Sequence, residues 1–360
     1  MKPHKTRHSR CTVAALLSLI LIAPMLPYAS AAPTAPGEPQ GLDAPRPEAS
    51  YPVSSLRFTI MMSSGKPADV IVYYPGFTGP RERMQRISEG PFPTVVFSPG
   101  AGASGDDYAD ALKPLAACGF VVAGVGWQYE SDREKDVAYK DHGKVIDEIK
   151  SRGEDWRSPL YRLPDTDHCG AFGHSRGGRT AFMASNVEPR IKAAGAWMPT
   201  LNNGSAVAMD IPKSLFGGMK DDTAPPANWS TPLYLSCEEP IMYVEAYNGT
   251  HGVEAEIHIN ITISFFKYHL LNDQTAETDV YGEAIKKRAQ SGEFRLRIKS
   301  CSGEYDSNPN ATVNQTGTYG RMQAVKEFPL YAALPLIVGI PVAVVFLLKK
   351  KGLRWKKAPA

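Results

Sequence analysis

Short apolar segments alternate with longer amphipathic segments along the middle of the chain. The apolar segments are rich in β-branched and aromatic residues and predict buried strands at Phe92–Ser98, Phe120–Val125, Cys169–His174 and Ile191–Trp197. Apolar residues at helical spacing predict helices at Asp106–Cys118, at Arg133–Ser151 and directly after Ser175. Strands and helices that alternate in this way predict an α/β fold, with a mainly parallel central sheet covered by helices on both faces.

Further elements are predicted on either side of this alternating region. Leu56–Met62 and Ala68–Tyr74 have the pattern of paired strands, with a Gly65-Lys66-Pro67 turn between them. After an insertion at residues 201–230, the last two strands are expected at Pro232–Ser236 and Met242–Ala246. Ile259–Leu271 predicts a closing apolar helix, and more helix is expected from Val280 to Gln290. The globular domain is therefore expected at residues 51–300.

The two ends of the chain differ from the domain. Residues 1–31 combine four basic residues, an apolar run and Ala29-Ser30-Ala31, which is typical of a cleaved signal peptide. Residues 32–50 form a Pro- and Ala-rich spacer, and residues 301–327 a Ser/Thr/Asn-rich stalk. Residues 328–348 are long and apolar enough for one transmembrane helix or sorting anchor, and residues 349–360 form a basic tail expected on the cytoplasmic side. The sequence thus predicts export and anchoring at the cell surface.

The net charge of +3 belongs to these ends. Ten of the 40 basic residues lie within residues 1–31 and 349–360, which contain no acidic residue, leaving 30 basic against 37 acidic residues in between. An acidic domain has no electrostatic basis for binding nucleic acid. Six Asn-x-Ser/Thr triplets, beginning at Asn203, Asn228, Asn248, Asn260, Asn310 and Asn314, are candidate glycosylation sites of an exported glycoprotein.

No metal or cofactor is indicated. The chain has no Cys-x-x-Cys pair, and Asp165-Thr166-Asp167-His168 is interpreted as a solvated loop. After loss of the signal peptide, Cys118, Cys169, Cys237 and Cys301 remain, and one or two disulfides are compatible with export, although the sequence does not pair them.

The segment Gly173-His174-Ser175-Arg176-Gly177 contains the Gly-x-Ser-x-Gly pattern between a predicted buried strand and a predicted helix. In that setting the pattern predicts a sharp turn that exposes the serine hydroxyl and directs the N–H of the next residue, Arg176, at a developing oxyanion. Ser175 is therefore a candidate nucleophile. A second oxyanion donor is expected in the loop Ser98–Ser104, whose small residues let backbone approach a substrate.

His251 is the candidate base. It lies in the turn Asn248-Gly249-Thr250-His251-Gly252, just after a predicted strand and beyond the serine in chain order. A loop at the carboxyl edge of the sheet brings a histidine within hydrogen-bond distance of the nucleophile. His174, inside the turn itself, is expected to pack behind the serine.

Over residues 50–300 the chain resembles an α/β-hydrolase of the dienelactone hydrolase, cutinase-like polyester hydrolase and chlorophyllase group. The resemblance rests on "PFPTVVFSPGAGAS", "LAACGFVV", "GHSRGG", "TPLYLSCEEP", "YVEAYNGTHG" and "ITISFFKYHLLND". It implies an α/β-hydrolase fold with Ser175 as nucleophile, His251 as base, and Ala101 and Arg176 as oxyanion donors.

The acid that orients the histidine is left open by the sequence. The group places an aspartate after the penultimate strand, some twenty to thirty residues before the histidine, and no such segment is evident between the last two expected strands. Glu239 or Glu238 is the expected substitute, since glutamate orients imidazole as aspartate does. Asp210, Asp221 and Asp222 in the insertion are the alternatives, and a damaged triad is the third possibility.

Substrate contacts also differ from those of polyester hydrolases. Those enzymes carry an aromatic residue where this chain has Ala101, and a tryptophan where it has Thr200; Trp197, slightly earlier, is a candidate for the substrate cleft. The expected function is cofactor-independent hydrolysis of small-molecule or polymeric carboxylic esters by an exported, membrane-tethered serine esterase. The alternatives are a catalytically impaired scaffold that binds a partner, and an amidase or peptidase of the same fold.

Overall fold

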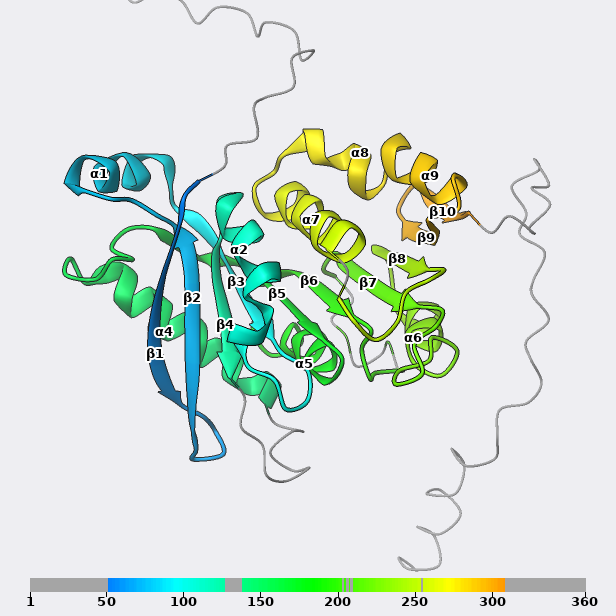
Figure 1. Ribbon diagram of the computed structural model, residues 1–360, viewed down its shortest axis with the longest axis horizontal. Helices are drawn as coiled ribbons and strands as arrows, with labels where there is room; N and C mark the ends of the chain where they lie inside the picture. Colours follow the sequence, from blue (N-terminus) through cyan, green and yellow to red (C-terminus); the bar gives the residue numbers. More distant parts are fainter. Residues whose placement is uncertain are drawn as a thin grey trace, which may run out of the picture. The chain divides into compact units, whose positions relative to one another are not determined.

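A single ten-stranded sheet forms the centre of the computed structural model, which describes residues 51–126, 138–202, 204, 207, 210–253 and 255–307 (Figure 1). The strands are β1 (Val53–Met61), β2 (Pro67–Pro75), β3 (Phe92–Ser98), β4 (Val121–Gly126), β5 (Pro164–His174), β6 (Ile191–Trp197), β7 (Lys213–Gly218), β8 (Ile241–Ala246), β9 (Phe294–Ser300) and β10 (Gly303–Asp306). Their order across the sheet is β1-β2-β4-β3-β5-β6-β7-β8-β9-β10.

Helices connect most of the central strands. The α-helices are α1 (Pro80–Glu89), α2 (Ala109–Ala117), α4 (His142–Glu154), α5 (Arg176–Ala184), α6 (Ser230–Ser236), α7 (Asn260–Leu270), α8 (Glu277–Val280) and α9 (Glu283–Gln290). Shorter 3₁₀ or π segments are η1 (Gly105–Tyr108), η2 (Ala138–Asp141), η4 (Ala255–Ile259) and η5 (Gln274–Ala276).

The six central strands, from β4 to β8, run parallel, and antiparallel strands flank them on both sides. Parallel strands place their carboxyl ends along one edge of the sheet, and in open α/β sheets ligands bind at that edge. The structure therefore confirms the predicted α/β-hydrolase-like fold with a mostly parallel sheet.

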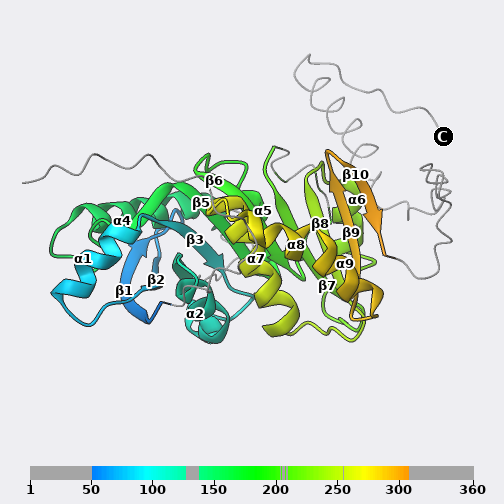
Figure 2. The ribbon, with the colours of Figure 1, turned by 90° about the horizontal axis from the view of Figure 1, so that it is seen from above.

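Side chains on alternate positions of each strand enter two separate layers of core. In β3, Val95 and Phe97 pack on one face with α2 and α7, whereas Val96 packs on the other face with α4 and α5. The second face continues under α6. Helices thus cover both faces, as Figure 2 shows, and the apolar runs of the central strands follow from burial on both sides.

The structure corrects the prediction for residues 201–236. The region taken as an insertion contains β7, and α6 occupies the segment predicted as the strand Pro232–Ser236. Strand β7 begins with Lys213 and Ser214, which are both fully buried. Because these two residues are polar, the sequence pattern does not predict a buried strand there. Leu233 of α6 and Cys237 directly after it are buried, whereas Leu235 is exposed, which is a helical rather than an alternating pattern.

The domain also extends beyond the predicted boundary at residue 300. Strands β9 and β10 form a hairpin, and β10 lies within the segment predicted as a stalk. The sequence of β9, Phe294-Arg295-Leu296-Arg297-Ile298, alternates apolar and charged residues, as a strand does. Arg297 is 7% exposed, and its guanidinium pairs with the Glu245 carboxylate of β8 at 2.7 Å. The charge of Arg297 is therefore buried in the sheet together with its partner.

Several predictions concern residues outside the described part of the chain. These are the signal peptide, the spacer 32–50, the transmembrane segment 328–348 and the tail 349–360, together with residues 133–137 of the predicted helix that the structure begins at His142. Within the described residues, no helix combines the length and apolar character that a membrane crossing needs.

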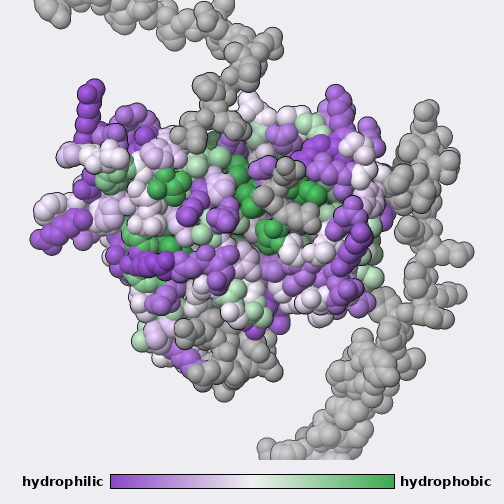
Figure 3. All heavy atoms as spheres, viewed as in Figure 1, coloured by the Kyte–Doolittle hydropathy of each residue, from purple (hydrophilic) through white to green (hydrophobic). Residues whose placement is uncertain are grey.

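The face in Figure 3 is mostly hydrophilic, with separate hydrophobic patches. Asn228, Asn248 and Asn260, which begin three of the sequons, are exposed. No disulfide joins Cys118, Cys169, Cys237 and Cys301 to one another.

The core contains histidines that burial holds neutral, and this predicts sensitivity to acid. Burial lowers the pKa of His142 and of His269 to about 4, and burial together with the nearby His251 lowers the pKa of His174 to about 4. Between pH 6.5 and 4 the unfolded chain binds protons at these positions and the folded chain does not, so the free energy of unfolding falls as the pH is lowered. Urea unfolding at pH 7 and pH 5 will show this loss. His142→Gln and His269→Gln are each expected to reduce the pH slope by about one proton; a slope unchanged by either variant contradicts the assignment.

Candidate active site

Ser175 occupies a sharp turn between β5 and α5. Its backbone has φ 55° and ψ −122°, a conformation that residues other than glycine rarely adopt. Its N–H donates to the Trp197 carbonyl at 2.8 Å, and its own carbonyl accepts from the Thr200 N–H at 3.3 Å. Neighbouring backbone thus holds the serine in a strained turn, which is the geometry of a nucleophile elbow.

The glycines on either side of Ser175 are required by close contact. A Cβ added to Gly177 would lie 2.0 Å from the Ser98 carbonyl oxygen, and a Cβ added to Gly173 would lie 2.4 Å from the Gly177 oxygen. No side chain fits at either position. The end of β3, the end of β5 and the start of α5 therefore meet backbone to backbone, and the serine turn is pressed against the loop that follows β3.

That loop, Ser98–Ser104, carries the expected oxyanion donor Ala101. Ala101 is exposed, while Gly100 beside it is buried. Arg176 is the first residue of α5, where the backbone N–H groups have no acceptor within the helix. The contact of Gly177 with the Ser98 and Pro99 carbonyls thus brings the two segments expected to supply oxyanion donors together.

His251 lies in the loop after β8, and its Nδ1 is 2.7 Å from Oδ2 of Asp221. The Asp221 side chain is fully buried, and its Oδ1 accepts the N–H groups of Thr223 and Ala224 at 2.9 and 2.7 Å. A carboxylate held at Nδ1 leaves Nε2 of the histidine as the nitrogen that accepts a proton. Asp221 therefore fixes both the orientation and the tautomer of His251.

Backbone contacts join the acid turn to the histidine loop. The Lys220 N–H donates to the Gly249 carbonyl at 2.8 Å, and the Met219 N–H donates to the Ala246 carbonyl at 2.9 Å. A Cβ added to Gly218 would lie 2.5 Å from the Gly249 oxygen, so the two turns are in direct contact. The carboxylate and the imidazole are positioned by one rigid unit at the ends of β7 and β8.

The histidine loop in turn contacts the serine turn. The rings of His174 and His251 have centroids 4.8 Å apart, and Nε2 of His174 lies 2.8 Å from the His251 carbonyl oxygen. Ser175, Asp221 and His251 thus follow β5, β7 and β8, at the carboxyl edge of the sheet and in the order of an α/β-hydrolase triad.

Comparison with known proteins agrees with this arrangement. The family model named PETase, PET hydrolase-like, matches residues 46–302, more than half of the chain. The chain belongs to the PET hydrolase-like family. Bis(hydroxyethyl) terephthalate hydrolase of Streptomyces coelicolor is 28% identical to it over 191 residues, which is 50% of this chain and 54% of that enzyme. The chain thus spans about half the length of this relative, and both findings support a hydrolase of carboxylic esters.

Within this PET hydrolase-like domain, Asp221 and not the expected Glu238 or Glu239 lies beside His251. Glu238 and Glu239 are exposed and lie before β8, whereas His251 lies after it. A six-residue strand is about 20 Å long, so neither glutamate is near the imidazole. Of the three alternative aspartates, Asp210 and Asp222 are exposed, and Asp221 is bonded to His251.

The sequence contained a signal for Asp221 that the strand prediction obscured. Asp221 follows β7 and precedes His251 by 30 residues, the spacing that the family resemblance leads one to expect. Without a strand at Lys213–Gly218, the predicted order of elements leaves no segment between the acid and the histidine. Pro212 before this segment and Gly217-Gly218 at its end are the turn signals that mark a strand there.

Trp197 is not part of a substrate cleft. It is fully buried between Phe97 and Phe172, and its Nε1–H donates to Oγ1 of Thr262 at 3.0 Å. Its contribution to the site is the backbone carbonyl that accepts the Ser175 N–H.

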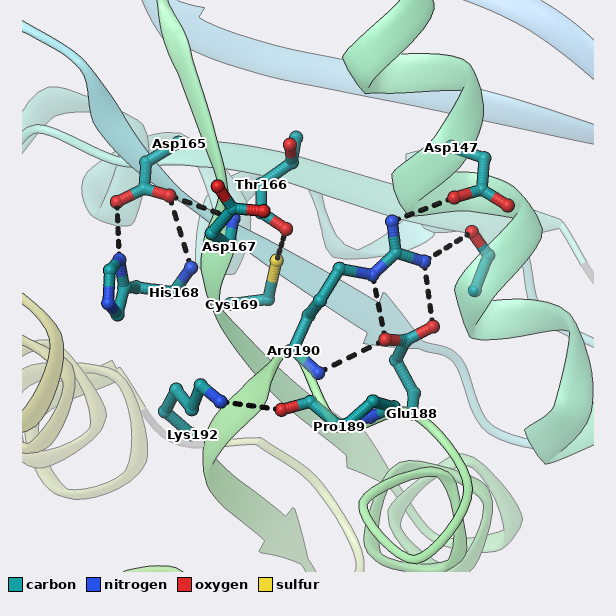
Figure 4. Close-up of polar contacts among 11 residues, drawn as sticks. Asp147, Asp165, Thr166, Asp167, His168, Cys169, Glu188, Pro189, Arg190 and Lys192 are labelled. Carbon is teal, nitrogen blue, oxygen red and sulfur yellow. Dashed lines mark hydrogen bonds and ion pairs between the residues drawn. The ribbon is translucent and has the colours of Figure 1, made fainter.

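The Asp165-Thr166-Asp167-His168 segment, predicted as a loop, belongs to the first part of strand β5, and its polar groups bond to one another (Figure 4). The Asp165 carboxylate accepts the N–H groups of Asp167 and His168 at 2.8 and 3.1 Å, and it lies 3.0 Å from Nδ1 of His168. Within the described residues, no three His, Cys, Asp or Glu side chains gather as metal ligands would. The ten residues to Ser175 span about 30 Å of strand, so this segment is remote from the site.

A second serine–histidine pair lies beneath the site. Oγ of Ser98 is 3.1 Å from Nε2 of His142, and both residues are fully buried. No substrate reaches this pair, so its role is to hold the end of β3 against α4.

Asp221→Asn is expected to lower kcat for ester hydrolysis by about 10³–10⁴, because an amide in place of the carboxylate favours the wrong imidazole tautomer and does not stabilise the imidazolium. The amide oxygen can still accept from Thr223 and Ala224, so the fold is retained. Steady-state kinetics on a soluble ester will measure the change. Glu238→Gln and Glu239→Gln are the matched controls, and a loss of similar size in either of them contradicts the assignment.

Proposed function

We propose that this protein is an exported serine hydrolase that cleaves carboxylic esters through an acyl-enzyme. The observation that carries the proposal is the 2.7 Å hydrogen bond between His251 and the buried Asp221, beside a serine held in a strained turn. An orienting carboxylate, an imidazole and a serine held in such a turn, here with only 8% of its surface exposed, are the parts of a nucleophilic triad. No cofactor is part of this chemistry.

In the proposed reaction, Oγ of Ser175 attacks the ester carbonyl carbon while Nε2 of His251 takes the hydroxyl proton. The resulting imidazolium is stabilised by Asp221 and returns the proton to the departing alcohol. Water then attacks the carbonyl carbon of the acyl-serine while His251 takes its proton. The bond to Oγ of Ser175 breaks, Oγ receives the proton from His251, and the carboxylic acid is released.

The negative charge that develops on the carbonyl oxygen requires donors. The N–H groups of Arg176 and Ala101 are proposed for this role, because both segments adjoin Ser175 and neither belongs to the interior of a helix or strand. Two such donors stabilise a tetrahedral intermediate by several kcal/mol in related reactions, with loss of one donor costing about 3 kcal/mol.

The substrate is proposed to be a small or flexible ester. Ala101 has no aromatic side chain to cover a substrate ring, and the burial of Trp197 removes the nearest aromatic candidate on the other side. The similar Streptomyces enzyme is named for bis(hydroxyethyl) terephthalate, a diester of low mass. That compound and short aliphatic esters are the first substrates to compare.

The impaired-scaffold alternative was motivated by the apparent lack of an acid. The contact between Asp221 and His251 removes that motivation. An amidase or peptidase would use the same groups, and nothing in the described residues favours it over an esterase.

The location is proposed from the ends of the sequence. Residues 1–31 have the pattern of a secretion signal, and the apolar run 328–348 is followed by a basic tail. The active domain would then be tethered outside the cytoplasmic membrane, with residues 308–327 as the tether.

Treatment of the full-length protein with a fluorophosphonate probe is expected to modify Ser175, since the probe reacts with serines that a neighbouring base activates. Peptide mapping by mass spectrometry will locate the adduct. Ser175→Ala will abolish it, and ester turnover will fall by about 10⁴ or more. Ser98→Ala is the matched control, because Ser98 also lies beside a histidine but has no exposed surface, whereas Ser175 is 8% exposed. A folded protein that remains unlabelled at Ser175 contradicts the proposed chemistry.

Deletion of residues 328–360 is expected to release active enzyme into the medium of cells that retain the full-length chain with their membranes. Fractionation followed by an ester assay will distinguish the two. Recovery of the full-length enzyme in the soluble fraction would argue against a membrane tether.

A further inference from the structure

Three hydrogen bonds in series cross the active site from one loop to another. The Gly100 N–H donates to the Tyr108 hydroxyl oxygen at 3.2 Å, and that hydroxyl lies 2.7 Å from Nδ1 of His174. Nε2 of His174 lies 2.8 Å from the His251 carbonyl oxygen. The series therefore joins the loop after β3, the serine turn and the loop after β8.

The donor and acceptor of each hydrogen bond follow from the last bond of the series, in which a carbonyl takes part. A carbonyl oxygen only accepts, so Nε2 of His174 carries the hydrogen. The neutral ring then has no hydrogen on Nδ1, which accepts the Tyr108 O–H, and the hydroxyl oxygen is left to accept the Gly100 N–H. Each donor meets one acceptor, and no other arrangement of a neutral histidine satisfies all three contacts.

The surroundings of His174 favour that neutral ring. The side chain is mostly buried, and burial, followed by the nearby charge of His251, lowers the pKa of His174 to about 4. The ring is also fixed in place by packing, because its centroid lies 5.8 Å from that of Tyr108, and Tyr108 lies 4.6 Å from Phe97.

Tyr108 is itself rigidly held. It ends the short segment η1, whose first turn is closed by Ser104, which donates from both its N–H and its hydroxyl to Asp107 at 2.7 and 3.0 Å. A Cβ added to Gly100 would lie 3.1 Å from both the Tyr108 hydroxyl and Nδ1 of His174, so the loop backbone rests directly on the pair.

We propose that Tyr108 and His174 are positioning residues that hold the oxyanion loop and the catalytic-histidine loop in one fixed relation to Ser175. This inference rests on the proposed serine-esterase function for its catalytic consequence. Gly100 directly precedes Ala101, so its placement decides where the second oxyanion donor lies. The His251 carbonyl belongs to the same residue as the base, so its placement limits how far the imidazole can move from the serine.

The structural part of the proposal is tested by hydrogen exchange, which needs no enzymatic activity. In Tyr108→Phe, peptides covering residues 98–104 and residues 247–253 are both expected to exchange about tenfold faster than in the wild-type protein, since loss of a buried hydrogen bond raises local opening. His174→Leu is expected to have the same effect. His174→Gln, which keeps one donor and one acceptor, is expected to restore slow exchange in both peptides.

The chain offers a matched control in Tyr281 and His269. The Tyr281 hydroxyl lies 2.9 Å from Nε2 of His269, a partly buried histidine in the last turn of α7, so Tyr281→Phe removes a similar bond away from the three loops. It is expected to leave exchange in residues 98–104 and 247–253 unchanged. Faster exchange confined to residues 98–104 in Tyr108→Phe, or equal effects of Tyr281→Phe, would overturn the proposal.

Kinetics test the catalytic part. Tyr108→Phe and His174→Leu are each expected to lower kcat about tenfold to a hundredfold with KM nearly unchanged, because small displacements of catalytic groups cost that much. The double variant is expected to match the slower single variant, since either change breaks the same series. Effects that multiply would overturn the proposal. A wild-type enzyme with no ester turnover would instead count against the proposed function, and exchange would still decide whether the series joins the loops.

Discussion

The backbone at Ser175 is held at a positive φ that costs about 1–3 kcal/mol for a residue with a side chain, and much of the surrounding structure serves to keep it there. The turn is fixed at both sides by bonds to Trp197 and Thr200. It is compressed from beneath by the contact of Gly177 with the Ser98 carbonyl. The strained backbone of the turn is therefore held by the sheet, because its central strands bring the serine turn into contact with the segments after β3 and β6. Relaxing the turn would withdraw the hydroxyl from the edge where the histidine and the oxyanion loop are placed.

The other groups of the site depend on the same edge of the sheet. Strands β7 and β8 are parallel neighbours, so the turns after them touch, and the Asp221 and His251 side chains meet without a long linker. The loop after β3 reaches the site because β3 lies next to β5. The proposed triad thus follows from the order of the strands, which places the three turns together, and the contacts of the side chains then fix their orientation.

The sequence predicted those residues of the site at which the backbone geometry restricts the type of amino acid. Ser175 was identifiable because the turn excludes any side chain at Gly173 and Gly177, and His251 because it follows an apolar strand. Asp221 was not selected from among its alternatives, because β7 begins with a buried lysine and a buried serine that tertiary contacts accommodate. Lys213 donates to the Ile211 carbonyl at 2.8 Å, a contact that no periodicity reveals. A tryptophan at position 197 is compatible with a substrate cleft and with the core. Only the packing of Phe97 and Phe172 around its side chain shows that it belongs to the core.

The separation of the triad along the chain has a consequence for its biogenesis. Strand β8 and the loop bearing His251 come last along the chain among the elements of the site, and β8 pairs in parallel with the earlier strand β7. Contacts between such distant segments form late, because closing the intervening loops costs entropy before any contact repays it. A chain that emerges from its N-terminus first carries Ser175 long before it carries a base. A half-made chain therefore lacks the proposed base, and the proposed hydrolysis requires that the last parallel strand has joined the sheet.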